Sequence, residues 1–596
     1  MKNLFPYLKP YRFSVFLIVV FIFLQSLLNL YLPQLMAHIV DQGVFTENIG
    51  YIWRVGGLML IVSIAAVVFS VAAGFLSSRT AARFSKVLRG NLFSHVETFS
   101  LHEFDEFGTA SLITRATNDI TQVQQMVTMM LRMMIMAPLN FIGGVIMAFY
   151  TNAHLSLVVV VLIPIIALII WAIFSKAAAL FKAMQQKIDV LNRVLRENLT
   201  GIRVVRSFNR TDYELDRFDR ANFDLTNTTT RAQKIMAGLM PILMLVMNVS
   251  TLAIIWFGGI RINNEQMQVG SLIAFTQYVL QLLFSIMMVS TMFFMIPRAS
   301  AAANRIFEVL RTTPEIRDLD QSSDSFKRED TPHREEDSKE EHALAADEER
   351  GKVEFRNVSF SYPGAEKPAL EDISFTAEPG QVTAIIGGTG SGKSTMISLI
   401  SRFYDVTEGS VLVDGVDVRE YPQVDLRSKI GLVPQRAILF TGSIADNVRF
   451  GKEDATDDEI RHAVEIAQAS EFISEMKDGF ESLIDQGGTN VSGGQKQRLS
   501  IARALVRQSQ IYIFDDSFSA LDFKTDAKLR SALKEHVSGS TVIIVAQRVT
   551  TVMDADLIVV LEEGRISGAG THRQLLEDCP VYREIVASQL SEEEIA

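Results

Sequence analysis

Long apolar stretches separated by polar connections crowd into the first 310 residues of the chain. The six stretches cover residues 13–32, 55–76, 133–150, 155–174, 238–259 and 271–296. Each is close to the roughly 20 residues that an α-helix needs to cross the hydrocarbon core of a bilayer. The first is interpreted as a span rather than a secretory signal, because five more follow and no small-residue cleavage site is evident. The pattern predicts a membrane domain of six transmembrane helices at residues 1–310.

Lysine and arginine are distributed unevenly over the connections between these spans. They precede the first span and are numerous between spans two and three and between spans four and five. The alternate connections are short and hold only Arg54 and Arg261. Because basic connections remain on the cytoplasmic side of a membrane, both termini are predicted to be cytoplasmic.

The two basic connections, residues 77–132 and 175–237, are long and show helical periodicity with few glycines or prolines. Loops of this length without structure of their own are uncommon, so helical extensions are favoured over a solvated loop. Folded as two antiparallel helices, each connection would project roughly 40 Å from the bilayer. Their apices, near Leu101–Asp119 and Phe208–Phe218, are expected to touch a cytoplasmic domain.

The character of the chain changes after residue 310. Residues 311–350 are dominated by Ser, Asp, Glu and Lys without an apolar period, which is typical of a flexible linker, either regulatory or a passive spacer. Residues 351–596 alternate strand and helix signals, the pattern of an α/β domain. The net charge of −11 argues against nucleic acid as the main partner, and a single cysteine, Cys579, excludes an intrachain disulfide.

A phosphate-binding loop of the form G-x-x-x-x-G-K-S lies between an apolar strand at 382–386 and a helical pattern at 396–400. Its backbone N–H groups and the helix N-terminus suit the phosphates of ATP. Lys393 is expected to reach the β- and γ-phosphates and Ser394 to bind Mg²⁺. The predicted nucleotide contacts in this loop are Gly387, Gly388, Thr389, Gly390, Ser391, Gly392, Lys393, Ser394 and Thr395.

Three further stretches carry chemistry that fits this loop. The buried-type strand Ile511–Asp515 ends in two carboxylates, of which Asp515 is predicted to hold Mg²⁺ directly or through water. Tyr362, upstream of the loop, either stacks on adenine or is a core tyrosine. Val491–Gln495 places Ser-Gly-Gly before a helical run and predicts a second anion site. Supplied by another copy of the domain, this second site would cover the free face of a phosphate bound at Lys393.

Together these features resemble an ABC exporter half-transporter, in which a six-helix membrane domain is fused to one α/β P-loop nucleotide-binding domain. The motifs are the aromatic loop at Tyr362, Walker A at Gly387–Thr395, the Q-loop at Gln435, the signature at Val491–Gln495, Walker B at Ile511–Asp515 and the D-loop Ser519–Asp522. The resemblance implies a multi-pass protein of the plasma membrane and a dimer with two ATP sites. Each site combines one subunit's Walker motifs with the other's signature, and Gln435 touches the Mg²⁺.

Two residues depart from the pattern of that family. Its general base is a glutamate, here Asp516, and its switch histidine is here Gln547. Asp is one methylene shorter than Glu, and Gln cannot carry the proton chemistry of an imidazole. The site is therefore predicted to bind ATP and hydrolyse it poorly. The signature, with Ser492, Gly493, Gly494 and Gln495, is intact.

This combination resembles the degenerate-site subunit of heterodimeric bacterial multidrug exporters. It predicts a sister half-transporter with an intact glutamate and histidine, and ATP-driven export of amphiphilic compounds. Methionine-rich spans suit varied apolar ligands. Two alternatives remain open, which are an exporter or flippase of one defined lipid or peptide and a low-turnover regulatory ATP-binding membrane subunit.

Overall fold

The computed structural model describes residues 4–318 and 350–590 of the chain. It divides into two compact units, the first formed by residues 1–97 and 109–312 and the second by residues 98–108 and 313–596. Most of the predicted acidic linker, residues 319–349, lies outside the described residues.

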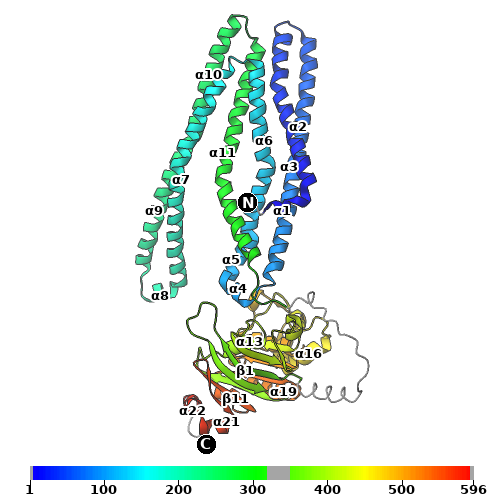
Figure 1. Cartoon of the computed structure of the whole chain (residues 1–596), viewed down its shortest axis with the longest axis vertical. Helices are drawn as coiled ribbons and strands as arrows, with labels where there is room; N and C mark the ends of the chain where they lie inside the picture. The colour runs from blue at the N-terminus through cyan, green and yellow to red at the C-terminus, as the bar shows by residue number, and fades with distance from the viewer. Residues whose placement is uncertain (1–3, 319–349, 591–596) are drawn as a thin grey trace, which may run out of the picture. The chain divides into compact units, whose positions relative to one another are not determined.

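The first unit is built of helices (Figure 1). They are α1 (Phe5–Leu8), η2 (Lys9–Tyr11), α2 (Arg12–His38), η3 (Ile39–Val44), α3 (Ile49–Val96), α5 (Thr109–Thr114), η4 (Arg115–Asp119), α6 (Ile120–Thr151), α7 (Ser156–Thr200), α8 (Ile202–Ser207), α9 (Thr211–Ala237), α10 (Leu239–Asn263) and α11 (Val269–Arg311). Within the described residues, 6 helical segments are long and apolar enough to cross a membrane. The six predicted spans are therefore confirmed, by length and composition.

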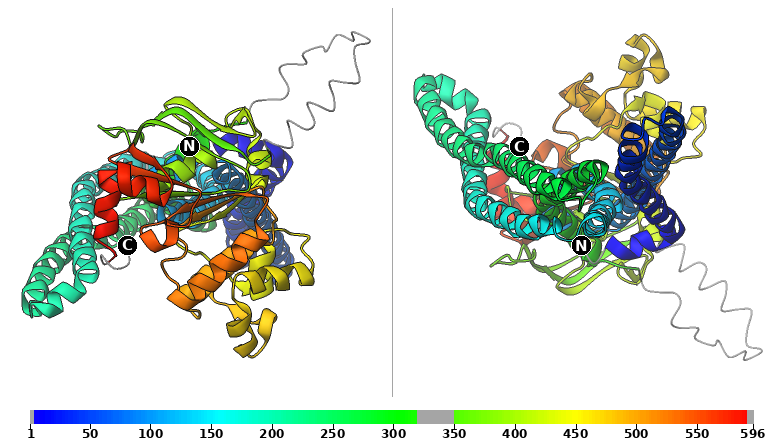
Figure 2. Two further views of the ribbon diagram at one scale, coloured as in Figure 1. Left: turned by 90° about the horizontal axis from the view of Figure 1, so that it is seen from below. Right: turned by 90° about the horizontal axis from the view of Figure 1, so that it is seen from above.

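Helices α3, α6 and α7 continue from the membrane spans into the predicted extensions, and α9 forms the extension that leads to α10, so helical extensions are found rather than loops. Helices α7 and α9 pack along each other, and both views of Figure 2 show this pair away from α2 and α3. The second apex was predicted near Phe208–Phe218, and the turn between α8 and α9 lies at the start of that range, at residues 208–210. Helix α9 already begins at Thr211, because Asp212 and Glu214 in its first turn favour a helix N-terminus.

The first apex falls where the sequence predicts it. Helix α4 (Leu101–Phe107) begins with a capping box at Ser100 and ends at Gly108, whose φ of 71° an L side chain rarely adopts. Residues 98–108 belong to the second unit, where the hydroxyl of Tyr404 donates to the Asp105 carboxylate over 3.4 Å. This apex therefore contacts the α/β domain, as predicted.

The second unit contains two main sheets. The smaller has the order β2 (Leu370–Ala377), β1 (Val353–Phe360), β4 (Glu408–Val413), β5 (Val416–Asp417), and all of its pairs are antiparallel. The larger has the order β12 (Arg565–Gly570), β11 (Leu557–Glu562), β3 (Val382–Gly387), β10 (Thr541–Val545), β9 (Ile511–Asp515), β6 (Ile430–Val433). All its pairs are parallel except that of β11 with β12. A short pair joins β7 (Gly442–Ser443) and β8 (Leu483–Ile484).

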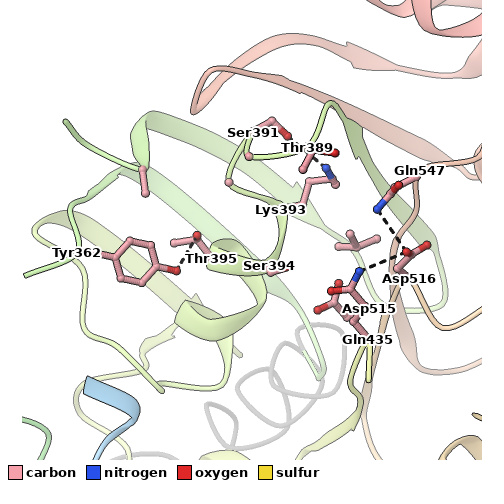
Figure 3. A pocket seen from close by; sticks show the side chains of 14 residues that line it. Tyr362, Thr389, Ser391, Lys393, Ser394, Thr395, Gln435, Asp515, Asp516 and Gln547 are labelled. Atoms are coloured by element: carbon pink, nitrogen blue, oxygen red, sulfur yellow. Dashed lines mark hydrogen bonds between the residues drawn. The ribbon is translucent and has the colours of Figure 1, made fainter. Parts of the chain in front are cut away.

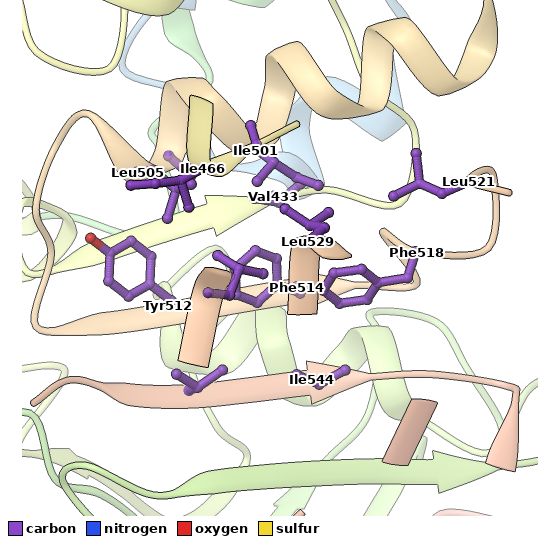
Figure 4. Packing of buried hydrophobic residues seen from close by; sticks show 14 of the residues in the cluster. Val433, Ile466, Ile501, Leu505, Tyr512, Phe514, Phe518, Leu521, Leu529 and Ile544 are labelled. Atoms are coloured by element: carbon purple, nitrogen blue, oxygen red, sulfur yellow. The ribbon is translucent and has the colours of Figure 1, made fainter. Parts of the chain in front are cut away.

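Alternate side chains of the central strands fill cores on the two faces of the larger sheet. Along β9, Tyr512 and Phe514 pack into one core, and Ile511 and Ile513 pack into the other. Figure 4 shows Phe514 beside Phe518 in the first of these cores, with ring centroids 5.4 Å apart. Because both faces are covered, the central strands consist almost entirely of apolar residues.

Helices surround these sheets, and several begin at residues that carry predicted chemistry. They are α13 (Lys393–Ile400), α14 (Gln423–Ser428), α15 (Ile444–Arg449), α16 (Asp457–Ile466), α17 (Ser470–Glu475), η5 (Gly479–Glu481), η6 (Gln486–Gly488), α18 (Gly493–Leu505), α19 (Phe523–His536), α20 (Val549–Val552), α21 (His572–Asp578) and α22 (Pro580–Ala587). Helix α18 follows the Ser-Gly-Gly stretch and α13 follows the phosphate-binding loop, so the strand–loop–helix context of both motifs is present.

Candidate nucleotide site

Several of the predicted nucleotide-binding residues meet where four neighbouring parallel strands end. The order β3, β10, β9, β6 brings the segments after these strands to one edge of the larger sheet. Together with Tyr362 and Ala369, which lie between β1 and β2, they enclose a cavity of about 330 Å³ (Figure 3). Its lining residues are Tyr362, Ala369, Thr389, Gly390, Ser391, Gly392, Lys393, Ser394, Thr395, Gln435, Asp515, Asp516, Val545 and Gln547.

The glycines of the loop after β3 are required by close backbone approaches. A Cβ at Gly387 would overlap the carbonyl oxygen of Leu561 on the neighbouring strand β11. At Gly392 φ is 100°, and a Cβ would lie 2.8 Å from the carbonyl oxygen of Ala369. Side chains at these positions would displace the loop, whereas glycine lets it turn tightly into α13 with its N–H groups available to an anion.

Lys393 is largely buried at the start of α13. Its Nζ donates to the carbonyl oxygens of Gly387 and Gly388 over 2.9 and 2.7 Å, and lies 3.4 Å from the Ser391 hydroxyl. Burial lowers the pKa of Lys393, and the negative charges of Asp516 and Asp515 oppose that shift. The ammonium group is therefore held at the floor of the cavity, where a phosphate group would offer it a stronger partner than neutral carbonyls.

Asp515 lies at the end of β9, with Ser394 and Gln435 also on the cavity wall. Burial raises the pKa of the Asp515 carboxyl, a hydrogen bond with Ser394 lowers it, and Asp516 raises it further. A bound cation would offset the repulsion between these carboxylates. One carboxylate, one hydroxyl and one amide oxygen are hard ligands of the kind Mg²⁺ accepts beside water and phosphate oxygens. The three residues fit this ion.

Asp516 occupies the position directly after β9 with φ of 45°, in the left-handed region. Its backbone N–H donates to Val545 over 2.8 Å, which ties it to β10. Its Oδ2 lies 3.5 Å from Gln435 Nε2 and 3.4 Å from Gln547 Nε2, both long for hydrogen bonds (Figure 3). The two residues that depart from the family pattern therefore contact each other, although they are 31 residues apart in the chain.

Tyr362 stands at the opposite end of the cavity from Asp516 (Figure 3). Its hydroxyl is 3.0 Å from the Thr395 hydroxyl, and its ring packs edge-on against Phe360 and Tyr404. The side chain remains 37% exposed, so it is not a core tyrosine. The ring is therefore partly accessible from the cavity that it lines.

Ser492–Gln495 of the signature and Asp522 of the D-loop are not among the residues that line this cavity. Ser492 caps α18, accepting from the Gln495 N–H while its own N–H donates to the Gln495 side chain over 2.8 Å. Both residues are exposed or partly exposed. Asp522 similarly caps α19 through the Thr525 N–H, and the hydroxyl and N–H of Thr525 lower its pKa.

Two contributions to this site were not predicted from the sequence. Ala369 and Val545 line the cavity, and Gln589 binds the backbone of the segment at Gln547. The strand pattern places Val545 at the end of β10, which is a usable signal. No pattern points to Gln589, because it lies 42 residues beyond Gln547 in the C-terminal part of the chain.

Six membrane-spanning helices and a phosphate-loop nucleotide site in one chain define a membrane transporter driven by ATP. The chain matches the ABC transporter transmembrane region over residues 15–286 and the ABC transporter family over residues 370–519. It is 44% identical to an uncharacterized ABC transporter ATP-binding protein of Mycobacterium tuberculosis (strain CDC 1551 / Oshkosh), over 98% of this chain and 97% of the relative. The chain therefore belongs to the ABC transporters.

More distant similarities concern the exporter branch of these transporters. The chain is 28% identical to an ATP-dependent lipid A-core flippase of Vibrio vulnificus (strain CMCP6), over 99% of this chain and 98% of the relative. A solved structure of a bacterial Atm1-family ABC exporter with ATP bound has a TM-score of 0.77 at 23% identity, covering 98% of this chain and 99% of that chain. The fold is that of an ABC exporter half-transporter, a multi-pass membrane protein that binds and hydrolyses ATP to drive export.

Proposed function

We propose that this chain is one half of a heterodimeric exporter of the plasma membrane and that its own site holds ATP but turns it over slowly. The observation that carries the proposal is the pair Asp516 and Gln547, which replaces the glutamate and histidine of the family at the edge of the nucleotide cavity. Mg²⁺ would be bound by Ser394, Gln435 and Asp515. The nucleotide-binding domain and both termini lie in the cytoplasm.

The partner would be a sister half-transporter with an intact Walker B glutamate and switch histidine. Ser492, Gly493, Gly494 and Gln495 of this chain would cover the ATP bound to the partner's Walker motifs. Their exposed positions around the first turn of α18 support this role, because free N–H groups at a helix start attract phosphate. The aromatic face of Tyr362 would stack on adenine, and Asp522 would face the partner across the dimer.

The transported compounds would be amphiphilic. A groove of about 600 Å³ between α6, α7 and α11 supports this, because its lining is almost entirely apolar and includes Trp171, Phe141 and Phe174. Among the lining residues, Ser285 contributes a polar hydroxyl group. A groove of this composition accepts hydrocarbon chains or aromatic rings and offers little to a strongly polar solute.

Flipping of one defined lipid is the second candidate, and the similarity to the lipid A-core flippase favours it. The same groove would then hold an acyl chain. The two candidates differ in breadth, since a drug exporter accepts several unrelated dyes and a flippase accepts one lipid class.

The test co-expresses this chain with candidate sister subunits and measures ATP-driven dye efflux and the transfer of fluorescent lipids between leaflets. We expect that loss of the partner's glutamate abolishes transport, whereas Asp516→Asn in this chain leaves much of it. Equal loss from both substitutions would refute the asymmetry. Full drug-stimulated ATPase activity of this chain as a homodimer would refute the need for a partner.

A further inference from the structure

We propose that Gln589, just after α22, is a positioning residue for the switch segment 547–549 and thereby regulates how long the nucleotide is held. The proposal rests on the proposed function of this site as a slow ATP-holding site. It assigns the C-terminal helix a role in the ATP cycle, beyond the motifs that touch the nucleotide.

The side-chain amide of Gln589 makes two hydrogen bonds to the backbone on either side of Arg548. Its Nε2 donates to the carbonyl oxygen of Gln547 over 2.8 Å, and its Oε1 accepts from the N–H of Val549 over 2.9 Å. Both distances are ordinary for strong N–H···O bonds. A carboxamide can donate one hydrogen bond and accept another, whereas an ionised glutamate can only accept. Glutamine can therefore make both bonds at position 589, and glutamate can make only one of them.

The segment that Gln589 holds carries a cavity residue. From this backbone the side chain of Gln547 reaches Asp516, at a distance of 3.4 Å. Because that contact is already long, a shift of the 547–549 backbone by a fraction of an ångström would break it. The two bonds from Gln589 therefore help to fix the position of Gln547 in the nucleotide cavity.

Helix α22 is itself firmly anchored to the domain. Tyr582 and Val586 are buried, Leu590 packs against the same core, and the Tyr582 hydroxyl is 2.7 Å from His572 Nδ1. Gln589, by contrast, is exposed. Its removal should leave the packing of the domain intact, which separates a positioning role from a role in folding.

The same helix also faces the phosphate-binding loop. A cavity of about 300 Å³ separates Gly388–Ser391 from Val581, Glu584 and Ile585 of α22. Helix α22 therefore lies beside the phosphate-binding loop on one side and is bonded to the switch segment at its end.

The experiment uses the full chain in lipid nanodiscs, loaded with radiolabelled ATP and Mg²⁺ and chased with unlabelled ATP. We expect Gln589→Ala to speed ATP release by about threefold to tenfold, the range for losing one or two surface hydrogen bonds. Gln589→Glu keeps only the bond from Val549, so it should release ATP at a rate between those of the wild type and Gln589→Ala. Ser588→Ala is the matched control, because its hydroxyl bonds only within the helix, to Ile585 over 2.7 Å, and it should match the wild type.

A double-substitution cycle shows whether the effect passes through Gln547. On a Gln547→Ala background, Gln589→Ala should change the release rate no further. Release from Gln589→Ala at the wild-type rate would overturn the proposal, and so would an equal acceleration on both backgrounds. The absolute wild-type rates of release and hydrolysis test the slow-site proposal separately, since the Gln589 effect is measured as a ratio.

Discussion

Replacing Asp516 by glutamate should restore a general base to this chain's own ATP site. The Asp516 backbone is fixed by its N–H bond to Val545 over 2.8 Å, so a longer side chain would extend into the cavity rather than move the loop. The added methylene advances the carboxylate by roughly an ångström, and a misplacement of that size costs about 100-fold in rate. This factor corresponds to about 2.7 kcal/mol of activation free energy.

The substitution also has a cost in stability. The φ of 45° at this position is in the left-handed region, which aspartate tolerates better than glutamate. We expect a penalty of about 1 kcal/mol, which lowers the unfolding temperature of the domain by about 2–4 °C. Faster ATP hydrolysis together with a lower unfolding temperature would indicate that the glutamate acts as a base, rather than that the substitution simply makes the folded site more stable.

The assay measures single-turnover hydrolysis of labelled ATP by the full chain in nanodiscs. We expect Asp516→Glu to raise the rate by about 10- to 100-fold and Asp516→Asn to leave the wild-type rate, which the proposal expects to be low, nearly unchanged. Adding Gln547→His should raise the rate of the glutamate variant further. A wild-type rate that falls sharply in Asp516→Asn would refute the reasoning, because it would mean that the aspartate already works as a base.

Three other measurements test the site and its domain. Gly387→Ala should abolish ATP binding in an equilibrium titration, because its Cβ would overlap the Leu561 carbonyl; retained affinity would contradict the close approach. Tyr362→Ala should weaken ATP binding about 5- to 150-fold, since a base stacked on an aromatic ring is worth about 1–3 kcal/mol. Tyr362→Phe should bind nearly as well as the wild type, because stacking needs no hydroxyl. Hydrogen bonds from the Lys452 side chain and from the Thr456 backbone N–H lower the pKa of Glu459 to about 2. The ionised carboxylate therefore stabilises the folded domain above its usual pKa, and this stabilisation is lost as the pH falls from about 4.5 towards 2. The unfolding temperature of the wild type should therefore exceed that of Glu459→Gln at pH 6, and the two temperatures should nearly coincide near pH 2. A difference that stays constant with pH would disprove the contribution of the Glu459 charge to stability.

Much of the first unit follows from local properties of the sequence. A run of about 20 apolar residues can satisfy its backbone in a bilayer only as a helix, so the six spans were predictable from composition alone. The extensions followed from helical periodicity without breakers. The second apex was placed only approximately, because helix ends depend on local capping, and the acidic residues at 212 and 214 lie in the first turn of α9.

The chemistry of the nucleotide loop also follows from sequence. Glycines, lysine and serine at fixed spacing suit only a narrow set of backbone conformations, and the positive φ at Gly390 and Gly392 agrees with this requirement. The substitutions at 516 and 547 could likewise be identified by position within the family motifs. Their consequences for hydrolysis remain predictions.

The tertiary structure alone decided which of these segments meet. Strands β3, β10, β9 and β6 lie side by side in an order that differs from their order in the chain, and that order brings Gln435, Asp516 and Gln547 to one cavity. The bonds from Gln589 to the switch segment likewise join residues 40 and 42 positions apart. The sequence determined the membrane helices and the phosphate loop because short-range sterics and hydrophobic periodicity act on neighbouring residues. Contacts between distant segments depend on strand order and helix packing, which no local pattern encodes.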